Sequence, residues 1–136
     1  MRIDNILLNK LTAQAQASPR LRMNLDLRNS AEDTSQRMLN AIEPGSVVPV
    51  HRHMTTSETV VMLRGRAVEE YYTSEGVLEE SVELVAGGPL CALNIPAGQW
   101  HTIKAMESGT VIIEMKDGAS EPLKEEDILR AVKSDI

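Results

Sequence analysis

Two short stretches of this chain contain all three of its histidines. The first, residues 45–65, reads GSVVPVHRHMTTSETVVMLRG, so His51 and His53 stand two residues apart and Glu58 follows. On a β-strand, side chains at positions i and i+2 point to the same face, about 7 Å apart along the strand. Two imidazoles held in this way can bind one metal ion, and the stretch therefore predicts strands around a metal site.

Glu58 and His101 can complete such a site. Glu58 follows a polar turn and opens the apolar run TVVML, so it begins the next strand. His101 closes the second stretch, PAGQWH, and starts another strand-like run, from which it can reach the ion across a sheet. A lone histidine or acid is usually a solvated residue, but here every histidine falls in the two stretches. We predict that one divalent metal ion is bound by His51, His53, Glu58 and His101.

Most of the remaining sequence predicts short strands. Residues 21–27 alternate apolar and polar side chains, and two runs flank a turn at residues 74–76, as in a hairpin. About nine or ten strands with turn signals near every tenth residue are typical of a sandwich or barrel. No helical segment separates them, so a parallel α/β sheet is not expected. Further strands are predicted at residues 89–95, 101–106 and 110–116.

Helices are predicted near both ends. Residues 4–17 place leucines on one face behind a capping Asp4 or Asn5, and Ser18-Pro19 ends the run. Residues 120–132 begin with a serine and carry acidic residues in the first turns, where a helix favours negative charge. We expect one domain over residues 1–136, made of a helix in residues 1–17, a β-barrel over 20–116 and a helix over 120–132.

The strand that begins at Glu58 is predicted to be covered on both faces. Glu58, Val60 and Met62 would share the face of the metal site, while Val61 and Leu63 point the other way. A strand that is apolar on both faces needs a cover on each, which a second sheet, a helix or another subunit can provide. We expect a homodimer first.

Charge and composition limit the partners. The net charge of −6 disfavours nucleic acids, which need a basic surface, and also anionic membranes. No apolar run has the length of a transmembrane helix or of a signal peptide. The single cysteine, Cys91, cannot form an internal disulfide and is expected as a buried apolar residue of a strand. A cytoplasmic location is expected.

The two histidine stretches resemble the two cupin motifs. The first fits at every spacing, with Gly45, five residues, the His-x-His pair, four residues, the glutamate, six residues and Gly65. The second, Pro-x-Gly-x-x-His, fits in its centre, but Gly88 lies two residues too far upstream and Ala105 replaces the closing asparagine. The resemblance to the cupin superfamily implies an all-β double-stranded β-helix, a jelly-roll barrel, with the same four metal ligands.

More narrowly, the chain resembles the WbuC-type cupin metalloproteins associated with bacterial surface polysaccharide gene clusters. The resemblance implies that residues 37–43, which are ambiguous by pattern, form a strand, and it also favours a homodimer. It carries over no reaction. The segments behind it are SPRLRMN at 18–24, QRMLNAIEPG at 36–45, HRH at 51–53, LRGR at 63–66 and IPAGQWHT at 95–102.

The predicted ligand set suits a metal-dependent enzyme acting on a small polar substrate such as a sugar or an organic acid. Nitrogen and oxygen ligands fit Fe, Mn, Co, Ni or Zn, and an octahedral ion would keep two positions open for water or substrate. Gln99, Arg64 and Tyr71 are the candidate catalytic helpers, since Arg64 shares a strand face with Glu58 and either Tyr71 or Tyr72 should face inward.

Two other functions are considered. A non-catalytic module would hold a metal and a small ligand without turnover. The other alternative is an epimerase, because the chain also resembles the metal-free nucleotide-sugar epimerases, which use a histidine base and a tyrosine acid. The complete ligand set and the absence of an evident basic cradle for a diphosphate argue against it.

Overall fold

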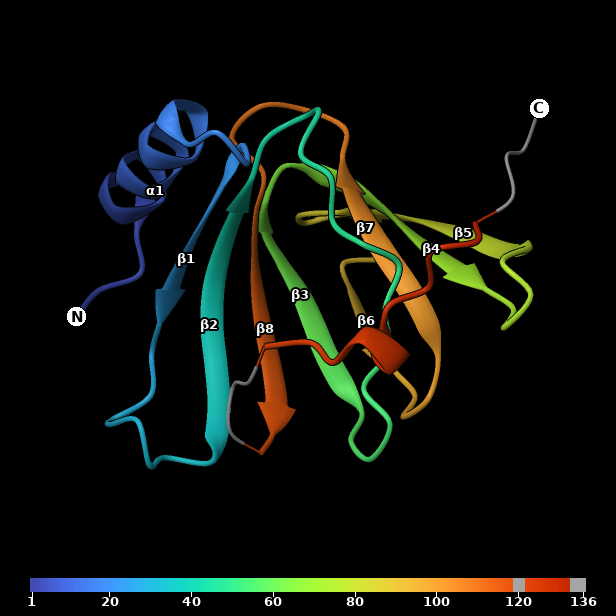
Figure 1. Cartoon of the computed structure of the whole chain (residues 1–136). Helices are drawn as coiled ribbons and strands as arrows, with labels where there is room; N and C mark the ends of the chain where they lie inside the picture. Colours follow the sequence, from blue (N-terminus) through green and yellow to red (C-terminus); the bar gives the residue numbers. More distant parts are fainter. Residues whose placement is uncertain (119–121, 133–136) are drawn as a thin grey trace.

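The computed structural model describes residues 1–118 and 122–132. Over this part of the chain it confirms the predicted all-β fold with an N-terminal helix (Figure 1). It has eight strands rather than nine or ten, because the His51–His53 segment forms only isolated bridges. The elements are α1 (Asn5–Ala17), β1 (Arg22–Asp26), β2 (Ser35–Ile42), β3 (Glu58–Arg64), β4 (Arg66–Tyr72), β5 (Leu78–Val85), β6 (Ala92–Ile95), β7 (Trp100–Ala105), β8 (Val111–Asp117) and the 3-10 helix η1 (Glu125–Asp127).

The strands form two antiparallel sheets with a shared core. One sheet has the order β1-β2-β8-β3-β6 and the other the order β5-β4-β7 (Figure 1). The core between them combines Val60 and Ile112 of the first sheet with Ala67 and Ile103 of the second. The two sheets form the antiparallel sandwich expected of a jelly roll, and most of the segment at residues 37–43 is indeed in a strand, β2.

Helix α1 covers the outer face of the larger sheet. The side chain of Asp4 accepts a hydrogen bond from the backbone of Leu7 and so caps the helix. Leu8, Leu11 and Ala15 are buried against β2 and β8, and Leu63 of β3 packs against the same cluster. A helix of the same chain therefore contributes to the second cover that β3 requires. No helix of the described residues is long and apolar enough to span a membrane.

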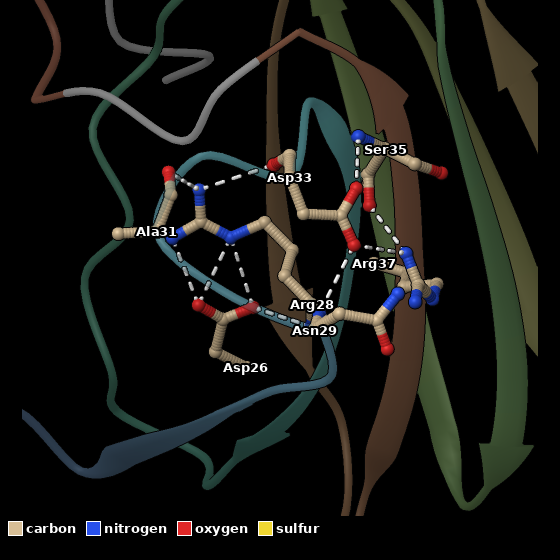
Figure 2. Close-up of polar contacts among 7 residues, drawn as sticks. All are labelled: Asp26, Arg28, Asn29, Ala31, Asp33, Ser35 and Arg37. Carbon is tan, nitrogen blue, oxygen red and sulfur yellow. Dashed lines mark hydrogen bonds and ion pairs between the residues drawn. The ribbon is translucent and has the colours of Figure 1, made fainter.

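The loop between β1 and β2 is held by charged side chains (Figure 2). Arg28 donates to both carboxylate oxygens of Asp26, at 2.9–3.2 Å. The carboxylate of Asp33 accepts from the backbone amides of Asn29 and Ser35. Exposed ion pairs contribute little to stability one by one. Their effect here is to shape the turn that sets β1 beside β2.

The predicted C-terminal helix over residues 120–132 is wrong for the residues from 122 onward, and its start lies outside the described residues. Only η1 is helical there. The chain then pairs with the segment before the first histidine, where the backbone amide of Leu129 donates to the carbonyl of Val50 at 2.8 Å. Ile128 forms a bridge with His51. Backbone pairing with a distant segment outweighs the local helix signals.

Strand β6 begins three residues later than the predicted run at 89–95. Cys91 precedes it and is free and exposed, not buried. The run at 89–95 therefore contributes only its second half to the sheet.

Candidate metal centre

The backbones of His51 and His101 form a two-sided bridge that brings the two sequence motifs together. The amide of His51 donates to the carbonyl of His101 at 3.0 Å, and the amide of His101 donates back at 2.8 Å. The imidazole centroids lie 4.4 Å apart. A bridge between residues 50 positions apart in the sequence thus places two predicted ligands side by side.

His53 and Glu58 complete the cluster. The ring of His53 lies 5.1 Å from that of His51 and 5.8 Å from that of His101. Glu58, buried at the start of β3, places Oε2 2.9 Å from Nε2 of His53 and 3.5 Å from Nε2 of His101. One potential ligand atom from each of the four residues lies within 4.8 Å of all the others. This spacing suits a single metal ion.

Backbone carbonyls orient two of the imidazoles. Nδ1 of His51 lies 2.8 Å from the carbonyl oxygen of Pro49, and Nδ1 of His101 lies 2.8 Å from that of Gln99. Because a carbonyl can only accept, each Nδ1 carries the proton and each Nε2 keeps its lone pair for a metal. In both cases the acceptor stands two residues before the histidine. The donor set of three imidazoles and one carboxylate therefore fits a divalent transition metal.

The charge states of His51 and Glu58 agree with metal binding. Burial, followed by the charge of the neighbouring His101, lowers the pKa of His51 to about 4, so this imidazole is neutral near pH 7. Burial opposes ionisation of Glu58, but the adjacent imidazoles of His101 and His53 outweigh it and lower its pKa. Neutral imidazoles and an ionised carboxylate are the forms that bind metals.

The cluster opens into a cavity of about 500 Å³ between the two sheets. This volume lies in the range of small-molecule sites. Apolar walls come from residues such as Val60, Ile103 and Ile112, while the C-terminal segment lines it with Pro122, Leu123, Lys124 and Asp127. Arg52, between two of the predicted ligands, pairs with Asp127 at 3.0 Å and stacks on Trp100. The cluster is therefore accessible to a small ligand and is not enclosed by its own residues.

Of the three predicted helpers, Arg64 is misplaced. Its guanidinium donates to the carbonyl of Gly109 at 2.8 Å and to Asn9 and Thr12 of α1. The prediction assumed unbroken alternation along β3, but the pairing of β3 with β8 shifts register between Met62 and Arg64. The shift turns Arg64 away from the face of Glu58, and the residue ties the helix to the barrel.

We expect Arg64→Leu to lower the free energy of unfolding by about 1–3 kcal/mol, because it leaves the carbonyl of Gly109 without this donor. Metal content should not change. Urea denaturation with elemental analysis of the same samples checks both expectations. Arg66→Leu is the matched control, since its exposed pair with Glu83 at 3.4 Å should contribute less than about 1 kcal/mol. Loss of metal in Arg64→Leu would contradict the structural role.

Gln99 and Tyr71 lie near the cluster but are not among the described residues that line the cavity. The amide of Gln99 donates to the carbonyls of Tyr72 and Trp100 and so holds the loop before His101. Tyr71 pairs with His101 in register and packs against the core between the sheets. Tyr71 thus lies on the side of β4 that faces the core between the sheets, while Tyr72, 6% exposed, is buried in a separate cluster with Val50 and Trp100.

The sequence analysis missed three polar residues inside the cavity. Asn40 of β2, Glu69 of β4 and Glu114 of β8 all line it. Burial, followed by the charge of Glu58, raises the pKa of Glu69 to about 9 and that of Glu114 to about 7. Strand alternation is a signal for Asn40 and Glu114, which share a face with the buried Ile42 and Ile112, but it does not separate Glu69 from Glu70.

Comparison with solved structures shows the class of the fold. The capsular polysaccharide assembling protein CapF of Staphylococcus aureus superposes with a TM-score of 0.61 at 23% identity, over 77% of this chain and 30% of CapF. KdgF from Halomonas sp. gives 0.59 at 17% identity, over 76% of this chain and 84% of KdgF. The cupin domain of Cnp3 from Schizosaccharomyces pombe gives 0.56 at 13% identity, over 73% and 65%.

These likenesses define a cupin fold, and the cluster is a His₃Glu set typical of cupin metal sites. The chain spans about 30% of the length of CapF. Its residues 3–84 match the family described as domain of unknown function DUF6016, and the chain belongs to that family. No protein with curated annotation matches the sequence.

Proposed function

We propose that His51, His53, Glu58 and His101 bind one divalent transition metal ion, Fe, Mn, Ni, Co or Zn, and that the protein is a metal-dependent enzyme acting on a small polar substrate. The observation that carries this proposal is the gathering of the four ligand atoms within 4.8 Å at the wall of a cavity of about 500 Å³. When bound, the metal would supply Lewis-acid chemistry to a substrate oxygen.

The opening of the cluster supports an enzyme over a purely structural metal site. Structural sites are closed by their own ligands, whereas catalytic sites keep a position open for water or substrate. Here the chain's own residues orient two imidazoles through Pro49 and Gln99, and apolar side chains line the cavity beside them. Gln99 and Tyr71, next to His101, remain candidate catalytic helpers. Arg64 is no longer a candidate, because its side chain binds α1 and Gly109.

The substrate we propose is a sugar or an organic acid, in surface polysaccharide metabolism. The resemblance to WbuC-type cupins supports this assignment, and so does the likeness in fold to CapF, which is described as a capsular polysaccharide assembling protein. The alternative is a non-catalytic module that holds a metal and a small ligand. The same cavity would serve both functions.

The test begins with elemental analysis of protein purified without an affinity tag. We expect one metal ion per chain in the parent and none in His51→Ala. Metal-loaded and metal-stripped protein are then screened for turnover and oxygen uptake with sugars and organic acids. Metal-dependent turnover supports the enzyme, and metal-dependent binding without turnover supports the module. A parent that neither retains nor rebinds metal contradicts both.

We further propose that residues 1–136 act as one cupin domain that forms a homodimer in the cytoplasm. The presence of one free cysteine, Cys91, accords with a reducing compartment. Sedimentation equilibrium measures the oligomeric state, and a monomer at micromolar concentration would contradict the dimer.

A further inference from the structure

Strand pairing places one acidic side chain on each sheet next to the four predicted metal ligands. Glu58 pairs with Lys116, and Glu114 stands two residues before Lys116 on β8. His101 pairs with Tyr71, and Glu69 stands two residues before Tyr71 on β4. Diagonal neighbours in a sheet lie about 7–8 Å apart, so each acid is one step along the cavity from a predicted ligand. A molecule of monosaccharide size spans that step.

Unpaired acceptors mark this region as a binding site rather than as part of the core. Oε1 of Glu69, a residue that is 1% exposed, has no hydrogen-bond partner. Neither does Oδ1 of Asn40, a residue that is 8% exposed, although its amide nitrogen donates to Oε1 of Glu114 at 3.2 Å. A buried acceptor without a donor costs free energy, and both residues line the cavity. These oxygens require hydrogen-bond donors from whatever occupies it.

The charged side chains that line the cavity favour a ligand with neutral hydrogen-bond donors over a cationic ligand. Four basic side chains line the cavity, Arg22, Arg52, Lys116 and Lys124, against four acidic ones, Glu58, Glu69, Glu114 and Asp127. A metal ion at the cluster would add positive charge, so an ammonium group gains little here. Hydroxyl groups fit better, because each can donate to an acceptor and also accept from a protonated carboxyl.

We propose that Asn40, Glu69 and Glu114 form a hydroxyl-binding subsite, so that the cavity takes a polyhydroxylated ligand whose hydroxyl groups contact these residues while an oxygen at its other end faces the histidine cluster. This inference rests on the proposed function for the cluster end of the ligand. The subsite itself depends only on the three residues. It narrows the substrate class from small polar molecules to polyols that carry an anionic or carbonyl oxygen.

Paired probes test the subsite. Gluconate and hexanoate have the same number of carbons and the same carboxylate, but only gluconate carries hydroxyl groups. Isothermal titration calorimetry on the metal-loaded full chain should show gluconate binding at least about 10-fold more tightly than hexanoate. Asn40→Leu and Glu69→Met remove one acceptor each and should reduce this preference by about 10-fold, with hexanoate unaffected. Glu69→Gln keeps an acceptor and should retain the preference.

Glu70→Gln is the matched control, because Glu70 is buried on the same strand but pairs with Lys104 at 2.9 Å outside the cavity. Equal affinities of the parent for the two probes overturn the proposal, as does a preference that persists in both Asn40→Leu and Glu69→Met. Elemental analysis of the same samples separates the two ideas. A parent that prefers gluconate but binds no metal keeps the subsite and contradicts only the proposed metal function.

Discussion

Replacement of Glu58 by glutamine is expected to weaken binding of Zn²⁺ or Co²⁺ by at least about 100-fold and to leave the barrel folded. Glutamine keeps the size of the side chain but removes the one negative charge of the cluster. Loss of an outer partner of a ligand alone costs about 10- to 100-fold in metal affinity, so loss of the charged ligand should cost at least as much. Calorimetric titration of metal-stripped protein at pH 7 measures the change.

The loss of metal affinity should also reduce the free energy by which added metal stabilises the folded protein. At a metal concentration about 1,000 times the parental dissociation constant, binding stabilises the parent by about 4 kcal/mol. A variant with 100-fold weaker affinity would gain only about 1.4 kcal/mol at that concentration. Glu70→Gln should respond like the parent, because Glu70 is as buried as Glu58, with both 6% exposed, but pairs with Lys104 away from the cluster. Equal metal responses of Glu58→Gln and the parent would place the metal elsewhere.

The four clustered residues could be found from the sequence because their spacing is local. The His-x-His pair and Glu58 lie within eight residues, and the loop before His101 carries its own signature. The structure shows why the second motif joins the first: the backbone bridge between His51 and His101. The strands could likewise be predicted from the local alternation of side chains, as the alternating burial along β3 shows.

Long-range pairing explains what the sequence analysis missed. The segment after residue 122 carries helix signals, yet the amide of Leu129 donates to Val50, and Arg52 pairs with Asp127. Arg64 was misplaced because the register shift in β3 has no signature in the residues themselves. Neither a partner segment nor a register shift can be deduced from local spacing.

Buried acids were missed for a different reason. In the segment RAVEEYY, two adjacent glutamates read as solvated residues, and nothing local indicates which one faces inward. The structure turns Glu69 into the cavity and Glu70 toward Lys104. Burial of an acid among apolar neighbours is costly, and a chain tolerates it most readily where a ligand repays the cost.

That cost predicts a pH dependence of stability. The pKa of Glu69 is raised from 4.5 to about 9, by burial first and then by the charges of Glu58, Glu114 and Glu70. Between these values the native state keeps a proton that the unfolded state has released. Stability therefore falls as the pH rises through this window, by at most about 1.4 kcal/mol per pH unit.

The test is best made between pH 7 and pH 9 on metal-stripped protein. His51 has a lowered pKa of about 4, so its opposing contribution rises with pH only up to about 6.5 and is constant above pH 7. Over the two upper units the parent should lose about 2–3 kcal/mol of unfolding free energy in urea denaturation. In Glu69→Gln this proton is absent, so only a small slope near pH 7 should remain, where Glu114 titrates with a pKa of about 7, while Glu70→Gln should keep the parental slope. A parental profile that is already flat, or an unchanged slope in Glu69→Gln, would mean that Glu69 is ionised in the native state and that the cavity is better solvated than its burial indicates.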